Sequence, residues 1–282
     1  MVKEFRFGVL IGGVDPRKAS STARSRTEFQ ETVRRLEALG FDVLSMADHL
    51  GSVAPFPGLA AAAQATTTMR LGTCVLNAGF YRDALLARDA AEVNLLSDGR
   101  LELGLGAGYV REEFEAAKLP FPSGRARLKH LERLTAYLKE HLPDVPVMVA
   151  GNGDRLLTMA ARRADIVSLT GEPRRAGLGD PLAERTAIIR DAAGPQFCEL
   201  ELNLLVAGVP VDGSGRPDLA FARRRSPDLS DEQLLALPGL LKGSPSDIAE
   251  TLSVYRDRYA ITYITVMEFH ADHFAKVIAE LR

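Results

Sequence analysis

Two residues that can move a proton stand together just after an apolar segment. Asp48 and His49 follow residues 42–46, whose Val, Leu and Met side chains are typical of a buried strand. Histidine changes charge near neutral pH, so an imidazole can give a proton to a substrate or take one from it. An adjacent carboxylate can orient the imidazole or bind a ligand group. The pair is therefore the strongest candidate for catalysis, with His49 as acid or base.

Two glycine-rich segments could hold a ligand close to the backbone. Gly104-Leu105-Gly106-Ala107-Gly108-Tyr109 looks like the start of a dinucleotide-binding fingerprint, but Tyr109 stands where the third glycine should be. Glycines at this place still let a flat ring approach the backbone. Gly151-Asn152-Gly153 precedes a predicted helix, whose first amides can bind a phosphate. A tight turn without a ligand explains these three residues equally well.

The other residue types that often carry chemistry have simpler interpretations here. Cys74 lies in an apolar run without an activating neighbour, which favours a buried hydrophobic role over a nucleophile. Four further histidines lie in or beside helical patterns and are interpreted as structural or solvated: His130, His141, His270 and His273. The last two have acidic neighbours, but they lack the i, i+4 spacing and the third ligand of a metal site. We expect no metal.

Eight short apolar runs alternate with amphipathic helical patterns and would position these residues. The runs are residues 5–11, 42–46, 71–76, 101–105, 145–150, 165–169, 200–206 and 262–267. Strands separated by helices pair in parallel, and eight such units in 282 residues match an α/β fold, the TIM (β/α)8 barrel. A doubly wound open sheet is the alternative. In a barrel, Asp48 and His49 would lie at the carboxyl ends of the strands, where active sites form.

One stretch interrupts the alternation. Residues 207–243 contain several Pro and Gly residues and a basic run, followed by a short helix capped by Ser230 and Gln233. We interpret them as an insertion in the seventh βα connection of a single domain that spans residues 1–282. Such a loop would lie on the catalytic face, where a lid and a plain solvated loop are equally favoured.

Composition excludes several classes of protein. The 35 basic and 37 acidic side chains give a net charge of -2, without the strongly basic balance of a nucleic-acid binder. The longest charge-free stretch, residues 53–69, contains prolines and polar residues that suit a membrane span poorly. Two distant cysteines form no disulfide framework, and charges interrupt the first apolar run, unlike a signal peptide. We expect a cytoplasmic protein that acts on a small molecule, with no nucleic-acid or membrane partner.

A set of short motifs, taken in order, resembles the luciferase-like monooxygenase superfamily and, within it, the coenzyme F420-dependent oxidoreductases. The motifs are EALGFD at 37–42, ADH at 47–49, RLGT at 70–73, LLSDGR at 95–100, GLGAGY at 104–109, EEF at 112–114, VMVAGNG at 147–153, AARRAD at 160–165 and LKGSP at 241–245. The resemblance covers residues 1–170 well and residues 240–282 fairly. It implies a TIM barrel that binds a deazaflavin at the carboxyl ends of the strands.

The resemblance also implies roles for single residues. His49 matches the proton donor or acceptor beside the ring, and Asp48 matches an acid that contacts the cofactor. Cys74 and Val75 match the site of a non-prolyl cis peptide bond that supports the ring. The remaining cofactor positions are Asn77, Ala107, Gly108 and Tyr109, with Gly151, Asn152 and Gly153 as the phosphate turn.

These inferences lead to one main functional hypothesis. We expect an F420-dependent oxidoreductase that transfers a hydride between the deazaflavin and a small organic substrate, with His49 handling the proton. Residues 11–14 and four aromatic residues, Phe56, Phe80, Tyr81 and Tyr109, would line the pocket. Sugar-phosphate dehydrogenases of this branch carry Glu at the position of Tyr109 and a Trp after the His. This chain contains no Trp, so it is not expected to oxidise a sugar phosphate.

Two other functions remain open from the sequence. The first is an FMN-dependent two-component monooxygenase on the same barrel, in which reduced FMN activates oxygen. The second is a non-catalytic relative that only binds a ligand or a partner. Homodimerisation is common in the family and is a further expectation.

Overall fold

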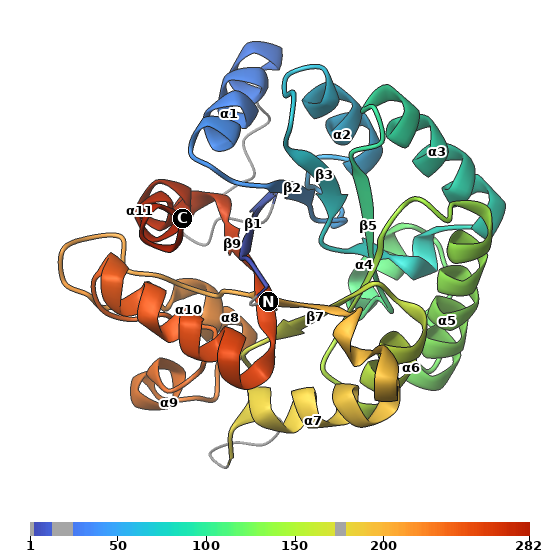
Figure 1. Ribbon diagram of the computed structural model, residues 1–282. Coiled ribbons are helices and arrows are strands. Elements are labelled where there is room, and N and C mark those ends of the chain that lie inside the picture. Colours follow the sequence, from blue (N-terminus) through green and yellow to red (C-terminus); the bar gives the residue numbers. More distant parts are fainter. Residues whose placement is uncertain (1–2, 13–24, 173–178) are drawn as a thin grey trace.

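A closed barrel of parallel strands forms the centre of the molecule (Figure 1). The computed structural model describes residues 3–12, 25–172 and 179–282. The strands are β1 (Arg6–Ile11), β2 (Val43–Met46), β3 (Arg70–Thr73), β4 (Leu76–Asn77), β5 (Leu101–Gly106), β6 (Val147–Ala150), β7 (Ile166–Thr170), β8 (Glu201–Leu205) and β9 (Ile261–Met267). Their order is β3-β2-β1-β9-β8-β7-β6-β5-β4, and β3 also pairs with β5, which closes the barrel. The barrel prediction is therefore confirmed, and the open sheet was wrong.

The third predicted strand, residues 71–76, is two strands in the structure. β3 pairs with the start of β5, and β4 pairs with its end, so both pieces occupy one position in an eight-membered barrel. Between β3 and β4 the backbone does not pair with β5, and the side chain of Thr73 bonds to β5 instead. Its hydroxyl donates to the Gly104 carbonyl and accepts from the Gly104 amide, both at 2.9 Å.

Helices surround the barrel on its outside (Figure 1). They are α1 (Arg26–Ala38), α2 (Pro55–Ala63), α3 (Asp83–Leu96), α4 (Arg111–Ala116), α5 (Gly124–His141), α6 (Asp154–Arg163), α7 (Pro181–Ala193), α8 (Ala220–Arg225), α9 (Asp231–Leu235), α10 (Pro245–Tyr259) and α11 (Ala271–Leu281), with short 3-10 turns η1 (Ala78–Phe80), η2 (Gly194–Cys198) and η3 (Glu268–His270).

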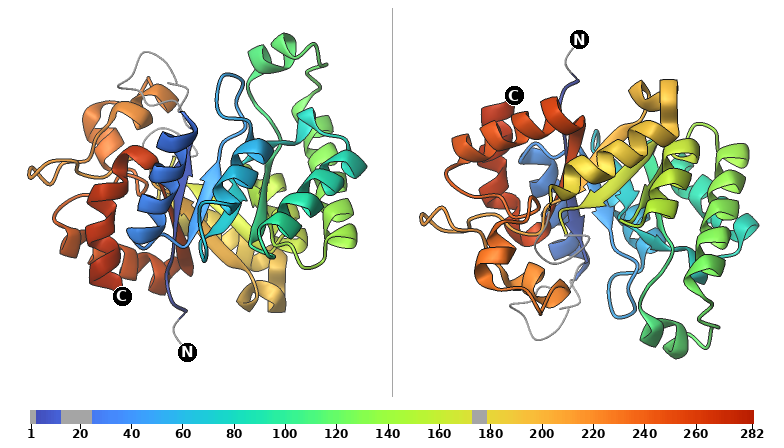
Figure 2. Two further views of the ribbon diagram at one scale, coloured as in Figure 1. Left: turned by 90° about the horizontal axis from the view of Figure 1, so that it is seen from above. Right: turned by 90° about the horizontal axis from the view of Figure 1, so that it is seen from below.

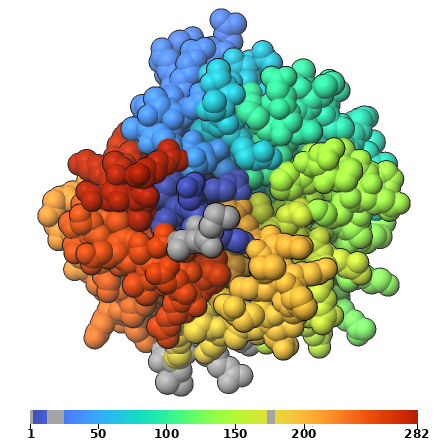
Figure 3. Space-filling model, in the orientation of Figure 1, coloured from blue at the N-terminus to red at the C-terminus, as the bar shows by residue number. Residues whose placement is uncertain are grey.

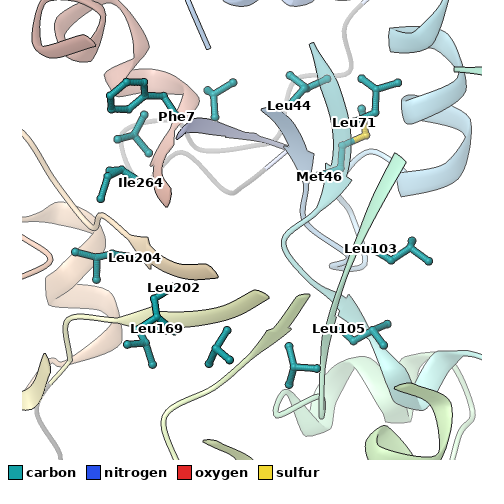
Figure 4. Close-up of a cluster of buried hydrophobic side chains, with 14 of the residues drawn as sticks. Phe7, Leu44, Met46, Leu71, Leu103, Leu105, Leu169, Leu202, Leu204 and Ile264 are labelled. Carbon is teal, nitrogen blue, oxygen red and sulfur yellow. The ribbon is translucent and has the colours of Figure 1, made fainter. Parts of the chain in front are cut away.

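Alternation along the strands divides the core into two layers. Outward side chains such as Leu44, Leu103 and Leu204 point from the strands toward the helices and form the main hydrophobic core (Figure 4). The inward side chains include a smaller apolar cluster of Val43, Met148, Ile166 and Tyr263. Inward glycines make room for the larger of these. A Cβ at Gly8 would lie 2.8 Å from the Tyr263 ring.

A polar network fills the end of the barrel where the strands begin. The buried Glu102 carboxylate accepts hydrogen bonds from Arg6 at 2.7 Å, from Tyr263 at 2.9 Å and from Arg70 at 3.3 Å. Arg6 also pairs with Glu201. Figure 3 looks onto this end, where dark blue atoms from the beginning of the chain lie at the centre and the later parts of the chain surround them. The charge of the buried Glu102 is therefore balanced by two arginines, Arg6 and Arg70.

The inserted segment lies at the opposite end of the barrel. In both views of Figure 2, α4 in green and α8 and α9 in orange lie on the side opposite the start of β1, at the carboxyl ends of the strands. Residues 207–243 follow β8, the seventh barrel strand, and Ser230 and Gln233 form the predicted capping box of α9. Ala222, Leu234 and Leu240 give the segment a small core of its own. Whether it moves as a lid remains a prediction.

Candidate active site

The predicted proton carrier lies where β2 ends, and a carboxylate from α4 holds it in place. His49 Nδ1 is 2.9 Å from Glu113 Oε1, and the same oxygen accepts the Leu50 amide at 3.2 Å. Against an ionised Glu113, Nδ1 carries the proton and donates it. Nε2 is then the ring nitrogen that can accept a proton. The His49 side chain is 38% exposed and that of Glu113 15%, so the pair can be reached from solvent while its anchor is largely enclosed.

Asp48 binds the segment that follows the break in the third strand. Its Oδ2 atom accepts the Asn77 amide at 3.0 Å, and it also hydrogen-bonds the Tyr81 hydroxyl. Burial raises the pKa of Asp48 above its usual range, although these hydrogen bonds oppose the rise. Burial and the neighbouring Asp48 raise the pKa of Tyr81 in turn. Asp48 therefore fixes residues 77–81 beside the site, and its contact with a cofactor remains a prediction.

A cis peptide bond joins Cys74 to Val75, as the family resemblance implied. Glycines make space for this segment. A Cβ at Gly104 would lie 2.0 Å from the Thr73 carbonyl oxygen, and one at Gly106 would lie 2.8 Å from Val75. The missing side chains of these two glycines therefore make room for the protein's own backbone and Val75.

Gly108 is required both by its backbone angle and by the side chain beside it. Its φ angle is +73°, which glycine adopts without strain, and a Cβ there would lie 2.2 Å from Asn77 Oδ1. Asn77 Oδ1 itself accepts the Gly79 amide at 3.0 Å. Gly108 and Asn77, two predicted cofactor positions, are thus in direct contact, and Ala107 packs partly buried against the core beside them.

The mouth of the barrel has an apolar floor. Leu10, Ala47 and Met267 form it, and Cys74, Leu205, Phe221 and Phe269 pack against them. Burial, together with the charge of Glu102, raises the pKa of the Cys74 thiol to about 12. The thiol therefore stays protonated at neutral pH and acts as a small hydrophobic group, in agreement with the sequence interpretation.

Tyr109 connects the histidine to the inserted segment. Its ring meets the His49 ring edge to face, with centroids 6.3 Å apart. Its hydroxyl accepts a hydrogen bond from Arg225 Nη1 at 3.1 Å, and Arg225 also pairs with Glu172. The last residue of α8 therefore reaches across to the loops after β5 and β7. Because these contacts span more than 50 residues of sequence, spacing alone did not indicate them.

The glycine turn after β6 leaves the start of α6 open. The Asn152 side chain donates to Thr170 Oγ1 at 2.6 Å and accepts the Thr170 amide at 3.3 Å, which ties β6 to β7. Gly153 is the N-cap of α6, without a side-chain cap, and nothing lies within 4 Å of the position its Cβ would take. With Gly151 before it, this turn presents uncapped helix amides, the arrangement that binds phosphate groups.

The predicted pocket aromatics divide between two places. Phe56 and Tyr81 meet edge to face with centroids 6.3 Å apart, near Asp48, whereas Phe80 packs on Phe114 at 5.4 Å. Residues 13 and 14, also predicted to line the pocket, lie outside the described residues. Glu113, Glu172 and Arg225 were not predicted as functional. Glu113 belongs to a motif quoted above, but the motif does not show which of its two glutamates faces His49.

The remaining histidines and the metal prediction can be compared with the structure. His130 donates through Nε2 to the Ala78 carbonyl at 2.9 Å and accepts from Arg133 at Nδ1, so it has the structural role that was expected. Over residues 3–12, 25–172 and 179–282, no cluster of three or more His, Cys, Asp or Glu side chains is placed to hold a metal ion. Across the same ranges, no helix is long and apolar enough to span a membrane.

Comparison with known proteins identifies the relatives. The luciferase-like monooxygenase family matches residues 5–185. Two F420-dependent glucose-6-phosphate dehydrogenases are each 30% identical, one from Kribbella flavida over 132 residues and one from Intrasporangium calvum over 183. These alignments cover 44% and 52% of this chain, and 40% and 55% of the relatives. The chain therefore spans about half the length of these relatives.

Solved structures agree with the fold. An F420-dependent secondary alcohol dehydrogenase, bound to an F420-acetone adduct, matches with a TM-score of 0.77 at 16% identity, over 99% of this chain and 100% of that one. A monooxygenase from Streptomyces bottropensis matches with a TM-score of 0.69 at 20% identity, over 97% and 96%. At such identities the likeness shows the barrel alone. The family match covers well over half of the sequence, and the chain therefore belongs to the luciferase-like monooxygenase family.

Proposed function

We propose that this protein is a coenzyme F420-dependent oxidoreductase that transfers a hydride between the deazaflavin and a small organic substrate. The observation that carries the proposal is the His49–Glu113 pair, held 2.9 Å apart at the mouth of the barrel above an apolar floor. A flat ring needs an apolar support, and proton transfer needs an oriented, accessible imidazole. Both are present at one end of the barrel, and the curated relatives are named as F420-dependent enzymes.

The residues at the mouth fit such a cofactor. The open amides at the start of α6, from Gly153 onward, would hold its phosphate, and Gly151 and Asn152 would shape the turn before them. The ring would be held by seven further residues, Asp48, Cys74, Val75, Asn77, Ala107, Gly108 and Tyr109. When bound, the deazaflavin supplies a carbon that accepts or donates a hydride, and its reduced form reacts poorly with oxygen.

His49 would complete the reaction by moving the proton. When an alcohol is oxidised, its carbon loses a hydride and its hydroxyl loses a proton, which His49 Nε2 accepts. In the opposite direction, His49 returns the proton to the carbonyl oxygen. Glu113 favours this exchange because its carboxylate fixes Nδ1 as the donor and stabilises the imidazolium.

The proposal is tested by titrating the purified protein with F420 and with FMN, following the fluorescence of each ligand. We expect tighter binding of F420. Gly153→Asp then tests the phosphate turn. The φ and ψ angles of Gly153, -82° and 139°, suit a side chain, and Asp is a good N-cap, so the variant should fold normally. The added charge should weaken F420 binding about tenfold or more.

Gly153→Asn is the matched control, because it adds the same shape and a similar cap without the charge. Equal F420 affinity in the two variants would refute the phosphate turn. Tighter binding of FMN would replace the proposal by an FMN-dependent monooxygenase. Binding of neither ligand would favour a non-catalytic relative.

A cytoplasmic location and a homodimer also belong to the proposal. Light scattering of the purified protein tests the second directly, since a monomer mass in dilute solution would refute it.

A further inference from the structure

A small hollow, about 20 Å³ in volume, lies at the same end of the barrel, beneath α8. Its walls are apolar: Leu205 from β8, Phe221 and Ala222 from α8, and Ala207 and Leu237 from the rest of the insertion. Leu205 and Phe221 also pack against the apolar floor of the barrel mouth. The hollow therefore adjoins the floor on which the proposed cofactor ring would lie.

Two charged residues line this hollow, and they neutralise each other. Glu172 pairs with Arg225, whose Nη1 also donates to the Tyr109 hydroxyl at 3.1 Å. A phosphorylated substrate placed here would meet the Glu172 carboxylate and a cation that is already paired. The Glu172 carboxylate would repel such an anion at close range. The lining instead suits an uncharged group.

The hollow is also close to the chemistry. Tyr109 contacts Arg225 on one side and the His49 ring on the other. Since Arg225 donates to the oxygen of Tyr109, the phenolic proton remains to be donated to another acceptor. A substrate oxygen near His49 and Tyr109 would leave the rest of the molecule to extend toward α8.

We propose that this hollow binds a small apolar end of an uncharged organic substrate, such as the methyl or ethyl group beside the carbonyl of a ketone or the hydroxyl of a secondary alcohol. The inference rests on the proposed function and gives its substrate class. It excludes sugar phosphates, although the relatives with 30% identity are named as glucose-6-phosphate dehydrogenases.

The test measures binding of a series of 2-ketones, from acetone to 2-octanone, by ligand-observed NMR titration. Each added methylene should tighten binding about three- to fourfold, which corresponds to ~0.8 kcal/mol, until the hollow is full. Glucose 6-phosphate should not displace the ketones. Ala207→Leu should end the gain at a shorter chain, and Phe221→Ala should extend it to a longer one.

Arg224→Leu is the control, because Arg224 is exposed on the same helix and does not line the hollow. Ketone affinity independent of chain length, displacement by glucose 6-phosphate, or the same length dependence in all three variants would overturn the inference. F420 binding is measured on the same preparations. Normal length dependence without F420 binding would overturn the cofactor proposal and leave the hollow supported.

Discussion

Replacing Glu113 by Leu should release His49 from its fixed orientation. A hydrogen bond to a charged group contributes about 1.5–3 kcal/mol, and the 38% exposure of the His49 side chain reduces this to about 1 kcal/mol. The preference for a proton on Nδ1 should therefore fall about fivefold. The other partner of Glu113, the amide of Leu50, belongs to a residue that is 52% exposed, so water can replace the lost carboxylate there.

The assay is nitrogen NMR of the imidazole at alkaline pH, where the ring is neutral and the shifts of its two nitrogens report the ratio of the tautomers. Glu112→Leu is the control, since Glu112 is an exposed neighbour on α4. Turnover gives a second measurement. Glu113→Leu should slow the wild-type enzyme about fivefold and leave a His49→Ala enzyme unchanged, because Glu113 acts only through the histidine. An unaltered tautomer ratio, or equal slowing in both backgrounds, would refute this reasoning.

Three further predictions concern stability and reactivity. Although burial opposes ionisation of Glu37, the amides of residues 67–69 hold its pKa below the usual range. Glu37→Gln should therefore lower the free energy of unfolding by about 1 kcal/mol at neutral pH, and urea unfolding should show the difference vanish as pH falls through the native pKa. Gly108→Ala should lower Tm more than Gly99→Ala, because both have positive φ but only the first adds a clash. In mass spectrometry of alkylated native protein, the exposed Cys198 should react well before Cys74, whose pKa is raised.

The arrangement of the barrel was predictable because its signal repeats. Each strand is a short apolar run, and each helix shows apolar residues at helical spacing. Because this pattern occurs eight times, an error in one unit does not change the predicted fold. The error occurred at residues 71–76, where the side chain of Thr73 bonds both backbone groups of Gly104. Threonine is common in strands, so the alternation of residues along the chain does not distinguish Thr73 from an ordinary strand residue.

The candidate site was predictable only in part. Asp48 and His49 stand directly after a strand, and their position follows from the barrel alone. The partners of His49 come from distant segments: Glu113 from α4, and Tyr109 with Arg225 behind it. Which side chains meet across a barrel mouth depends on how the loops fold back, and no local pattern records it.

The inserted segment has a consequence for engineering. Most residues around the hollow beneath α8 belong to residues 207–243, whereas His49, Glu113 and the glycine turn after β6 come from other parts of the chain. A mutant library confined to the insertion would therefore vary the shape of the hollow while keeping the proton carrier and the helix amides constant. Exchanging this one segment between relatives would therefore exchange most of the walls of the hollow on an unchanged barrel.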